Sequence, residues 1–209
     1  MFHSYKRCGQ LSISTDFGAC RDKVDLAFLV DASGNKNEKG QRNFETALAI
    51  AKAISSMFVI NPLQTHIGFV VFSTNSQVVL SFKTYLDIKS VENTIDSLKY
   101  TGASTNIGAG LKLAKSQLFD ITSRPNVPHI LIVLTSGKST EDILAPSKAL
   151  KDSGVNVLCI GIGNRYDKKE LDDISTSPDA GHVLSGDATK LGKTIREIRR
   201  IICQGKQLC

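Results

Sequence analysis

The chain has 209 residues, of which 41% are hydrophobic and 22% are charged. This composition suits one globular domain with a core large enough to fold unaided, and it argues against fibrous, low-complexity and disordered classes. The formal net charge of +6 is small for a dedicated nucleic-acid-binding protein, and the absence of tryptophan leaves few aromatic surfaces for stacked bases.

The distribution of apolar residues gives no sign of a membrane segment. No run of roughly 18 uncharged apolar residues occurs, so we expect no membrane span. The N-terminal segment Met1–Cys8 also lacks the apolar stretch of a secretory signal.

The cysteines point to a different conclusion about the compartment. They are Cys8, Cys20, Cys159, Cys203 and Cys209, so four of them lie near the two ends of the chain. This placement suits a disulfide that joins the ends of an extracellular module, whereas a metal site would favour a local Cys-x-x-Cys pair. We therefore expect a segment of a secreted protein whose signal is not part of this chain. A cytosolic protein with five reduced thiols is the alternative.

The first predicted elements follow a polar segment. Residues 1–22 have no apolar period, and we expect a linker or the tail of a preceding module there. The apolar run Val24–Val30 predicts a strand buried on both faces. Apolar residues at helical spacing then predict an amphipathic helix over about residues 38–58, which Asn61 and Pro62 end.

A hairpin and two helices come next. Ile67–Phe72 is a second buried strand, and the short turn after it predicts that Val78–Phe82 returns as an antiparallel strand at an edge of the sheet. Val91, Ile95 and Leu98 mark a short helix, and Ile107 to Leu118 has the spacing of another.

The remaining elements continue the alternation of strand and helix. They are a strand at Ile130–Leu134, a helix from Ile143 to Leu150, a strand at Val155–Ile162, a helical turn at Leu171–Ile174, a short strand at His182–Leu184 and a final helix at Leu191–Ile202. This order predicts a doubly wound α/β fold, with a mostly parallel sheet, one antiparallel edge strand and helices on both faces. We expect one domain over residues 23–203, with a tail at 204–209.

Ligands of an open α/β sheet bind beyond the carboxyl ends of the strands, so the loops at 31–35, 102–108 and 135–139 are the ones to inspect. Four stretches in and around them carry a resemblance. They are Asp25–Gly34 (DLAFLVDASG), Ile67–Ser73 (IGFVVFS), Thr101–Leu111 (TGASTNIGAGL) and Ile132–Gly137 (IVLTSG). In this order they resemble a von Willebrand factor type A domain over about 180 residues of the chain.

The resemblance implies a metal-ion-dependent adhesion site, in which an Asp-x-Ser-x-Ser loop, a threonine and a second aspartate hold Mg²⁺. Asp31, Ser33 and Thr105 match this pattern, but Asn35 replaces the second serine and Ser136 replaces the second aspartate. Asp31 is then the only carboxylate in the pattern, and one negative charge is too little to neutralise a divalent cation that has lost part of its hydration shell. We therefore expect no cofactor or only weak Mg²⁺ binding. Without the ion, Asp31 is expected to cap the following turn or to bond the Thr105 hydroxyl.

The resemblance also suggests a function. We expect a non-catalytic extracellular adhesion module that binds a matrix protein such as collagen without a metal. Metal-dependent adhesion through Asp31, Ser33 and Thr105 is the alternative. Extracellular members of the family often join their ends by a disulfide, which suggests Cys20 to Cys203 here. Cys8 and Cys209 are left to pair with each other, with a neighbouring module or with a second chain in a disulfide-linked oligomer.

The other signals are weaker. Gly137-Lys138-Ser139 ends like a phosphate-binding loop but lacks its first glycine, because Ile132 stands there. The four histidines are scattered, and Cys159 in an apolar strand suits an inert core thiol, so we expect no enzyme.

The final helix carries a cluster of cations, Lys190, Lys193, Arg196, Arg199 and Arg200. A solvated helix face accounts for them. The alternative is a structural, matrix-assembly role in which this face binds a sulfated glycosaminoglycan or another acidic matrix polymer.

Overall fold

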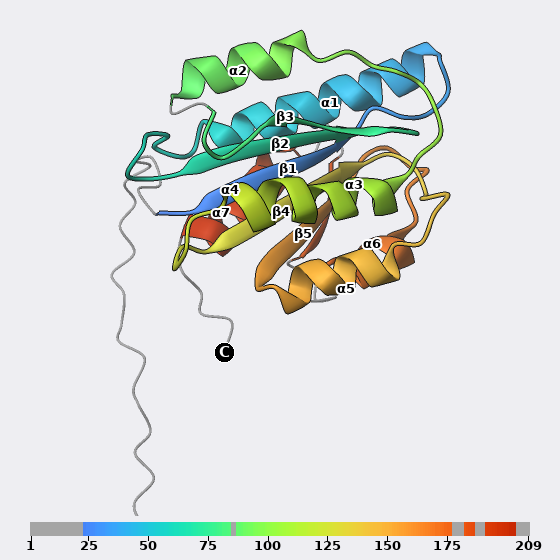
Figure 1. Ribbon diagram of the computed structural model, residues 1–209. Coiled ribbons are helices and arrows are strands. Elements are labelled where there is room, and N and C mark those ends of the chain that lie inside the picture. Colours follow the sequence, from blue (N-terminus) through green and yellow to red (C-terminus); the bar gives the residue numbers. More distant parts are fainter. Residues whose placement is uncertain (1–22, 85–86, 177–181, 187–190, 204–209) are drawn as a thin grey trace, which may run out of the picture.

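The computed structural model describes residues 23–84, 87–176, 182–186 and 191–203 of the chain. The strands are β1 (Asp25–Asp31), β2 (His66–Phe72), β3 (Ser76–Leu80), β4 (His129–Thr135), β5 (Val155–Gly161) and β6 (Val183–Ser185). They form one sheet in the order β3-β2-β1-β4-β5-β6, and every neighbouring pair is parallel except β2 and β3. The predicted doubly wound sheet with one antiparallel edge strand is therefore confirmed (Figure 1).

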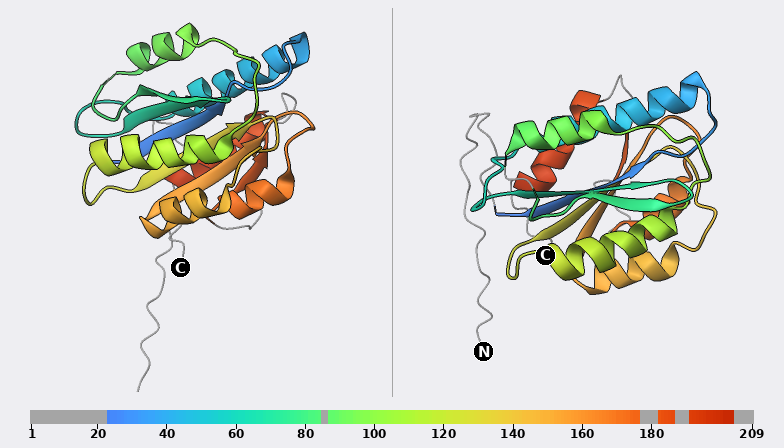
Figure 2. Two further views of the ribbon diagram at one scale, coloured as in Figure 1. Left: turned by 45° about the vertical axis from the view of Figure 1, so that its right-hand side comes forward. Right: turned by 45° about the horizontal axis from the view of Figure 1, so that its top comes forward.

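Helices cover both faces of this sheet. They are α1 (Glu38–Ser55), α2 (Ile88–Ser97), α3 (Ile107–Leu113), the π-helical turn η1 (Ala114–Phe119), α4 (Asp120–Thr122), α5 (Leu144–Asp152), α6 (Lys168–Ile174) and α7 (Leu191–Cys203). Helices α1, α2 and α7 pack on one face, and α3, α5 and α6 pack on the other (Figure 2). No helix among the described residues is long and apolar enough to cross a bilayer.

The core consists of two layers that share the central strands. All seven residues of β1 are buried, as expected for a parallel strand covered on both faces. Because side chains alternate along a strand, Leu26 and Phe28 join the layer under α1, while Ala27 and Leu29 join the layer under α3. The sheet is thus fixed from both sides, and the loops at its carboxyl ends start from a rigid base.

Two predicted boundaries differ from the structure. The helix expected over 38–58 ends at Ser55, because Met57 and Phe58 donate to the carbonyls three residues earlier and tighten the chain into a turn. The strand expected over 78–82 is β3, which begins and ends two residues earlier. Phe58 and Phe82 are nevertheless buried. They are apolar because they pack into the core, although neither belongs to the helix or the strand.

A buried ion pair ties the amino end of β1 to the loop before β4. The Asp25 carboxylate is fully buried and accepts from the Arg124 backbone N–H at 2.6 Å and from its Nε at 2.8 Å. The Arg124 Nη2 also donates to the Val24 carbonyl at 3.0 Å. His66 and His129 lie beside the same carboxylate, at 3.9 and 3.8 Å. No sequence pattern indicated this ion pair, because Asp25 and Arg124 are 99 positions apart.

Candidate functional site

Four of the expected site residues meet beyond the carboxyl ends of β1 and β4, three from the loops after these strands and one from the loop before α3. Asp31 ends β1, Ser33 follows it, Thr105 precedes α3 and Ser136 follows β4. Parallel strands end at the same edge of a sheet, and β1 and β4 are neighbours, so residues about 100 positions apart meet here.

The Asp31 carboxylate is held by four hydrogen bonds from this chain. Its Oδ1 accepts from the Ser33 backbone N–H at 2.8 Å and from the Ser33 hydroxyl. Its Oδ2 accepts from the Thr135 hydroxyl at 2.8 Å and from the Ser136 backbone N–H at 3.0 Å. Since a carboxylate offers about four lone-pair positions, these donors use its accepting capacity.

Two hydroxyls extend this network toward the surface. The Ser33 Oγ lies 2.6 Å from the Thr105 Oγ1. Because Ser33 gives its proton to Asp31, Thr105 is the donor of this second bond. Asp31 therefore caps its own turn through Ser33, and it reaches Thr105 through that hydroxyl rather than directly. A β-carbon at Gly137 would lie 2.9 Å from the Thr105 Oγ1, so the approach of the two loops needs glycine there.

Burial determines the electrostatics of the network. Asp31 is 3% exposed. Removal from water raises the pKa of its carboxyl above the ordinary value, and the bonds from Ser33, Ser136 and Thr135 oppose that rise. The Asp31 carboxylate is therefore shielded from solvent, and it is stabilised mainly by the dipoles of the surrounding loops.

Asn35 and Ser136 occupy the two positions that depart from the family pattern. Asn35 is exposed, and it receives the Tyr100 hydroxyl at 2.8 Å through its backbone carbonyl. Ser136 is half-buried, and its backbone N–H bonds Asp31. Neither supplies a carboxylate.

These residues fit a divalent cation poorly. Mg²⁺ requires oxygen ligands with free lone pairs and enough negative charge to offset the loss of water. The single carboxylate is engaged in four bonds, and the Ser33 and Thr105 hydroxyls are bonded to each other. The described residues also contain no group of three or more His, Cys, Asp or Glu side chains placed to hold a metal.

Two residues that support the site were missed from the sequence. Thr135 supplies a donor to Asp31 although it is the last residue of a buried strand. Glu170, at the start of α6, accepts from the Ser139 backbone N–H at 3.0 Å, and burial raises the pKa of its carboxyl. Glu170 therefore holds the loop that carries Ser136. Only the pattern of a polar residue ending an apolar strand could have indicated Thr135, and no local pattern indicated Glu170.

Replacing Asp31 with asparagine is expected to destabilise the domain by about 1–3 kcal/mol. Each carboxylate oxygen accepts from a backbone N–H, so in either orientation the asparagine NH2 group would face a donor instead of an acceptor. The deficit should depend on pH. The raised pKa means that native Asp31 holds its proton more tightly than the unfolded chain does, so the wild type loses stability as the pH rises from the ordinary value of 3.8 through the native value. The asparagine variant lacks this loss. Urea unfolding of both proteins should therefore show a deficit that shrinks as the pH rises above the ordinary value of 3.8, and a deficit that grows with pH would contradict the assignment.

The basic helix presents fewer free cations than its sequence suggests. Lys193 and Arg196 are exposed, but Arg200 is paired with Glu197 through its Nε at 3.0 Å and its Nη2. Arg199 is half-buried and has an interaction of its own, and Lys190 lies outside the described residues.

The cysteines can be placed only in part. Cys159 is a free thiol buried in β5, and burial raises its pKa, as expected for an inert core residue. Cys8, Cys20 and Cys209 lie outside the described residues, and Cys203 is described only as the last residue of α7.

Comparison with known proteins places the chain in a family. Vitrin from Bos taurus is 30% identical over 185 residues, which cover 88% of this chain and 28% of vitrin. The collagen alpha-6(VI) chain from Mus musculus is 33% identical over 165 residues, which cover 77% of this chain and 7% of that one. The chain thus spans a minor part of the relatives that it matches.

The structural comparison agrees. Proximal thread matrix protein 1 from the mussel byssus has a TM-score of 0.79 and is 26% identical, with 88% of this chain and 47% of that chain covered. One structure of that protein has a zinc-occupied metal-ion-dependent adhesion motif. The family model for the von Willebrand factor type A domain matches residues 25–197. The chain belongs to the von Willebrand factor type A domain family.

Proposed function

We propose that this domain is a non-catalytic, secreted module of the extracellular matrix. It binds another matrix protein without a metal ion, and collagen is the first candidate partner. Its relatives support the matrix setting, since they include a collagen chain, a matrilin and a thread matrix protein. The observation that carries the metal independence is the bonding of Asp31 to four donors of its own chain.

The alternative is metal-dependent capture of the partner through Asp31, Ser33 and Thr105. The zinc-occupied motif of the mussel protein favours it, because the folds are similar. In this chain, however, an ion would have to displace the bond between Ser33 and Thr105, and a serine stands where the pattern has its second carboxylate. The loss of that charge favours recognition by shape and hydrogen bonds, for which an interface of ordinary size suffices.

The experiment compares binding of the chain to immobilised collagens in EDTA, in Mg²⁺ and in Zn²⁺. We expect the dissociation constants to agree within about twofold, and calorimetry to show no Mg²⁺ binding tighter than about 1 mM. Loss of collagen binding in EDTA would establish the metal-dependent alternative.

Ser136→Asp provides the matched comparison, because it restores the missing carboxylate in a half-buried position. This variant is expected to gain measurable affinity for Mg²⁺. If the wild type binds Mg²⁺ as well as the variant does, Ser136 does not limit the site and the proposal fails.

A polyanion-binding role for α7 has less support. Among the described residues of this helix, only Lys193 and Arg196 are exposed cations with no ion pair. A protein is therefore a better-supported partner than a sulfated glycosaminoglycan or an acidic polymer.

A further inference from the structure

Strand β3 forms one open edge of the sheet (Figure 1). It pairs with β2 on its inner side, and among the described residues no strand pairs with its outer side. Because alternate residues of an edge strand turn their backbone N–H and C=O groups away from the sheet, β3 presents donors and acceptors to solvent. Within the described part of the chain, these groups make no backbone hydrogen bond outside the β2–β3 hairpin. The outer edge can therefore accept one more strand.

Proteins usually protect such an edge, and β3 carries few of the usual devices. Charged side chains, prolines, bulges and very short strands keep edges from pairing with other chains. The segment Ile67–Phe82, which spans most of β2, the turn and β3, has no charged residue and no proline. The register with β2 shifts between Phe69 and Val70, but Ser76–Val78 is regularly paired. The opposite edge is better protected, because β6 has only three residues.

The side chains of β3 are neutral and partly apolar. Gln77 is exposed, whereas Val78 and Val79 are half-buried and pack against opposite layers of the core. A strand beside them would cover more of the apolar surface of both valines. The whole chain carries a net charge of +6, so two copies repel each other on average, and an uncharged edge is where they approach at the lowest electrostatic cost.

We infer that β3 is a self-association edge, at which two copies of this chain pair their β3 strands antiparallel about a two-fold axis. Such a contact is isologous, because the same residues face each other from the two copies. An axis near Gln77 and Val78 places only serine, glutamine, valine and leucine side chains of β3 opposite one another. The backbone groups of the edge specify a strand as the occupant. The absence of charge favours a second copy over a charged segment of another protein.

The contact is expected to be weak and reversible. The five residues of β3 span about 17 Å, so we expect the interface to be smaller than that of a stable dimer. The dissociation constant should be on the order of 10–100 µM. Sedimentation velocity of the full chain, from about 5 µM to about 500 µM, measures the equilibrium. Dilution separates this dimer from a disulfide-linked one, which does not dissociate.

Gln77 tests the inference because it is exposed and lies next to the proposed axis. Gln77→Lys and Gln77→Glu each bring like charges together across the axis, so each variant is expected to weaken dimerisation at least about tenfold. An equal mixture of the two variants should recover a dimer, because the lysine of one copy then faces the glutamate of the other. Both variants should unfold at the wild-type urea concentration, since the side chain is exposed.

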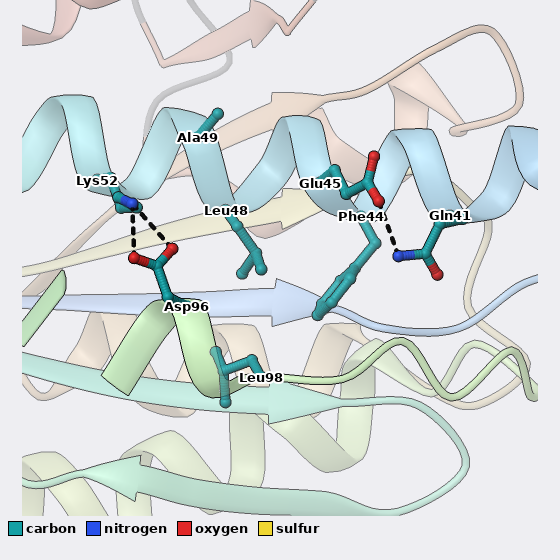
Figure 3. Close-up of a pocket in the computed structure, with 8 residues that line it drawn as sticks. All are labelled: Gln41, Phe44, Glu45, Leu48, Ala49, Lys52, Asp96 and Leu98. Atoms are coloured by element: carbon teal, nitrogen blue, oxygen red, sulfur yellow. Dashed lines mark hydrogen bonds and ion pairs between the residues drawn. The ribbon is translucent and has the colours of Figure 1, made fainter. Parts of the chain in front are cut away.

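Gln41→Lys is the matched control, because it makes the same substitution at an exposed glutamine away from the edge. Gln41 lies on α1, where it lines a groove between α1 and α2 and donates to Glu45 at 2.9 Å (Figure 3). This variant should dimerise within about twofold of the wild type. A wild type that stays monomeric up to about 500 µM, or a Gln77→Lys variant that dimerises as well as the wild type, would overturn the inference.

Amide hydrogen exchange locates the contact. At a concentration that favours the dimer, the outward amides of Ser76–Leu80 should exchange more slowly than in dilute protein, whereas those of β6 at the opposite edge should not change. Dimerisation without slower exchange in β3 would place the contact elsewhere and contradict the inference. Neither measurement involves a matrix protein, so the proposed function stands or fails separately.

Discussion

Replacement of Arg124 with alanine is expected to lower the free energy of unfolding by about 3–5 kcal/mol. The guanidinium is the principal counter-charge of Asp25, whose side chain is fully buried. Without it, the Asp25 carboxylate would lose its counter-charge and the bond from the arginine Nε, and the Val24 carbonyl would lose the bond from Nη2. Urea unfolding, followed by circular dichroism, measures the change.

Two variants separate this effect from the loss of a surface arginine. Arg165→Ala removes an exposed arginine with no ion pair within the described residues and should change stability by less than about 0.5 kcal/mol. The double variant Asp25→Asn with Arg124→Met removes both charges and should recover much of the loss, because an uncompensated buried charge costs more than the pair contributes. A double variant that is less stable than Arg124→Ala would show that the pair itself, rather than an orphaned charge, dominates.

The disulfide predicted between Cys20 and Cys203 is expected to make the second large contribution to the stability of the domain. Replacing both cysteines with serine is expected to lower the free energy of unfolding by about 2–5 kcal/mol, because the bond would close a loop of almost the whole domain. Strand β1 begins at Asp25 and α7 ends at Cys203, and Figure 1 shows both at the same end of the sheet. Cys203 is the last residue of α7, and Cys20, which lies outside the described residues, precedes β1 by five positions in the sequence.

Mass spectrometry of the unreduced protein checks the pairing before stability is measured. We expect a peptide in which Cys20 and Cys203 are joined, and a Cys159 thiol that is alkylated only after unfolding because it is buried in β5. Alkylation of Cys20 in the native, unreduced protein would refute the bond. The same spectra assign Cys8 and Cys209 to each other, to free thiols or to a second chain.

Secondary structure was largely predictable because it depends on neighbours in the sequence. The run Val24–Val30 identified a strand buried on both faces, and the short turn after Phe72 identified the antiparallel edge strand β3. The main differences arose where a side chain is buried from outside a regular element. Phe82 lies beyond β3 and packs against Phe119, at 5.4 Å between ring centroids, so its apolar character was misread as part of the strand.

The location of the candidate site could also be predicted, because parallel strands place their carboxyl ends at one edge. This rule was enough to bring Asp31, Ser33 and Ser136 to neighbouring loops, whereas Thr105 comes from the loop between α2 and α3 and was indicated by the family resemblance. It did not predict which atoms bond. Thr135 and Glu170 support the site through contacts 104 and 31 positions apart, which no local period records.

The alternation of apolar runs and amphipathic helices, together with the loop motifs, was sufficient to specify an α/β domain and the missing carboxylate at Ser136. The folded chain was needed to show that Asp31 is bonded to four internal donors, that Arg124 reaches Asp25, and that a groove opens between α1 and α2. The physical reason is the distance in sequence over which each kind of signal acts. Burial periodicity acts over a few residues, whereas hydrogen bonds and grooves depend on the relative positions of side chains brought together from distant parts of the chain.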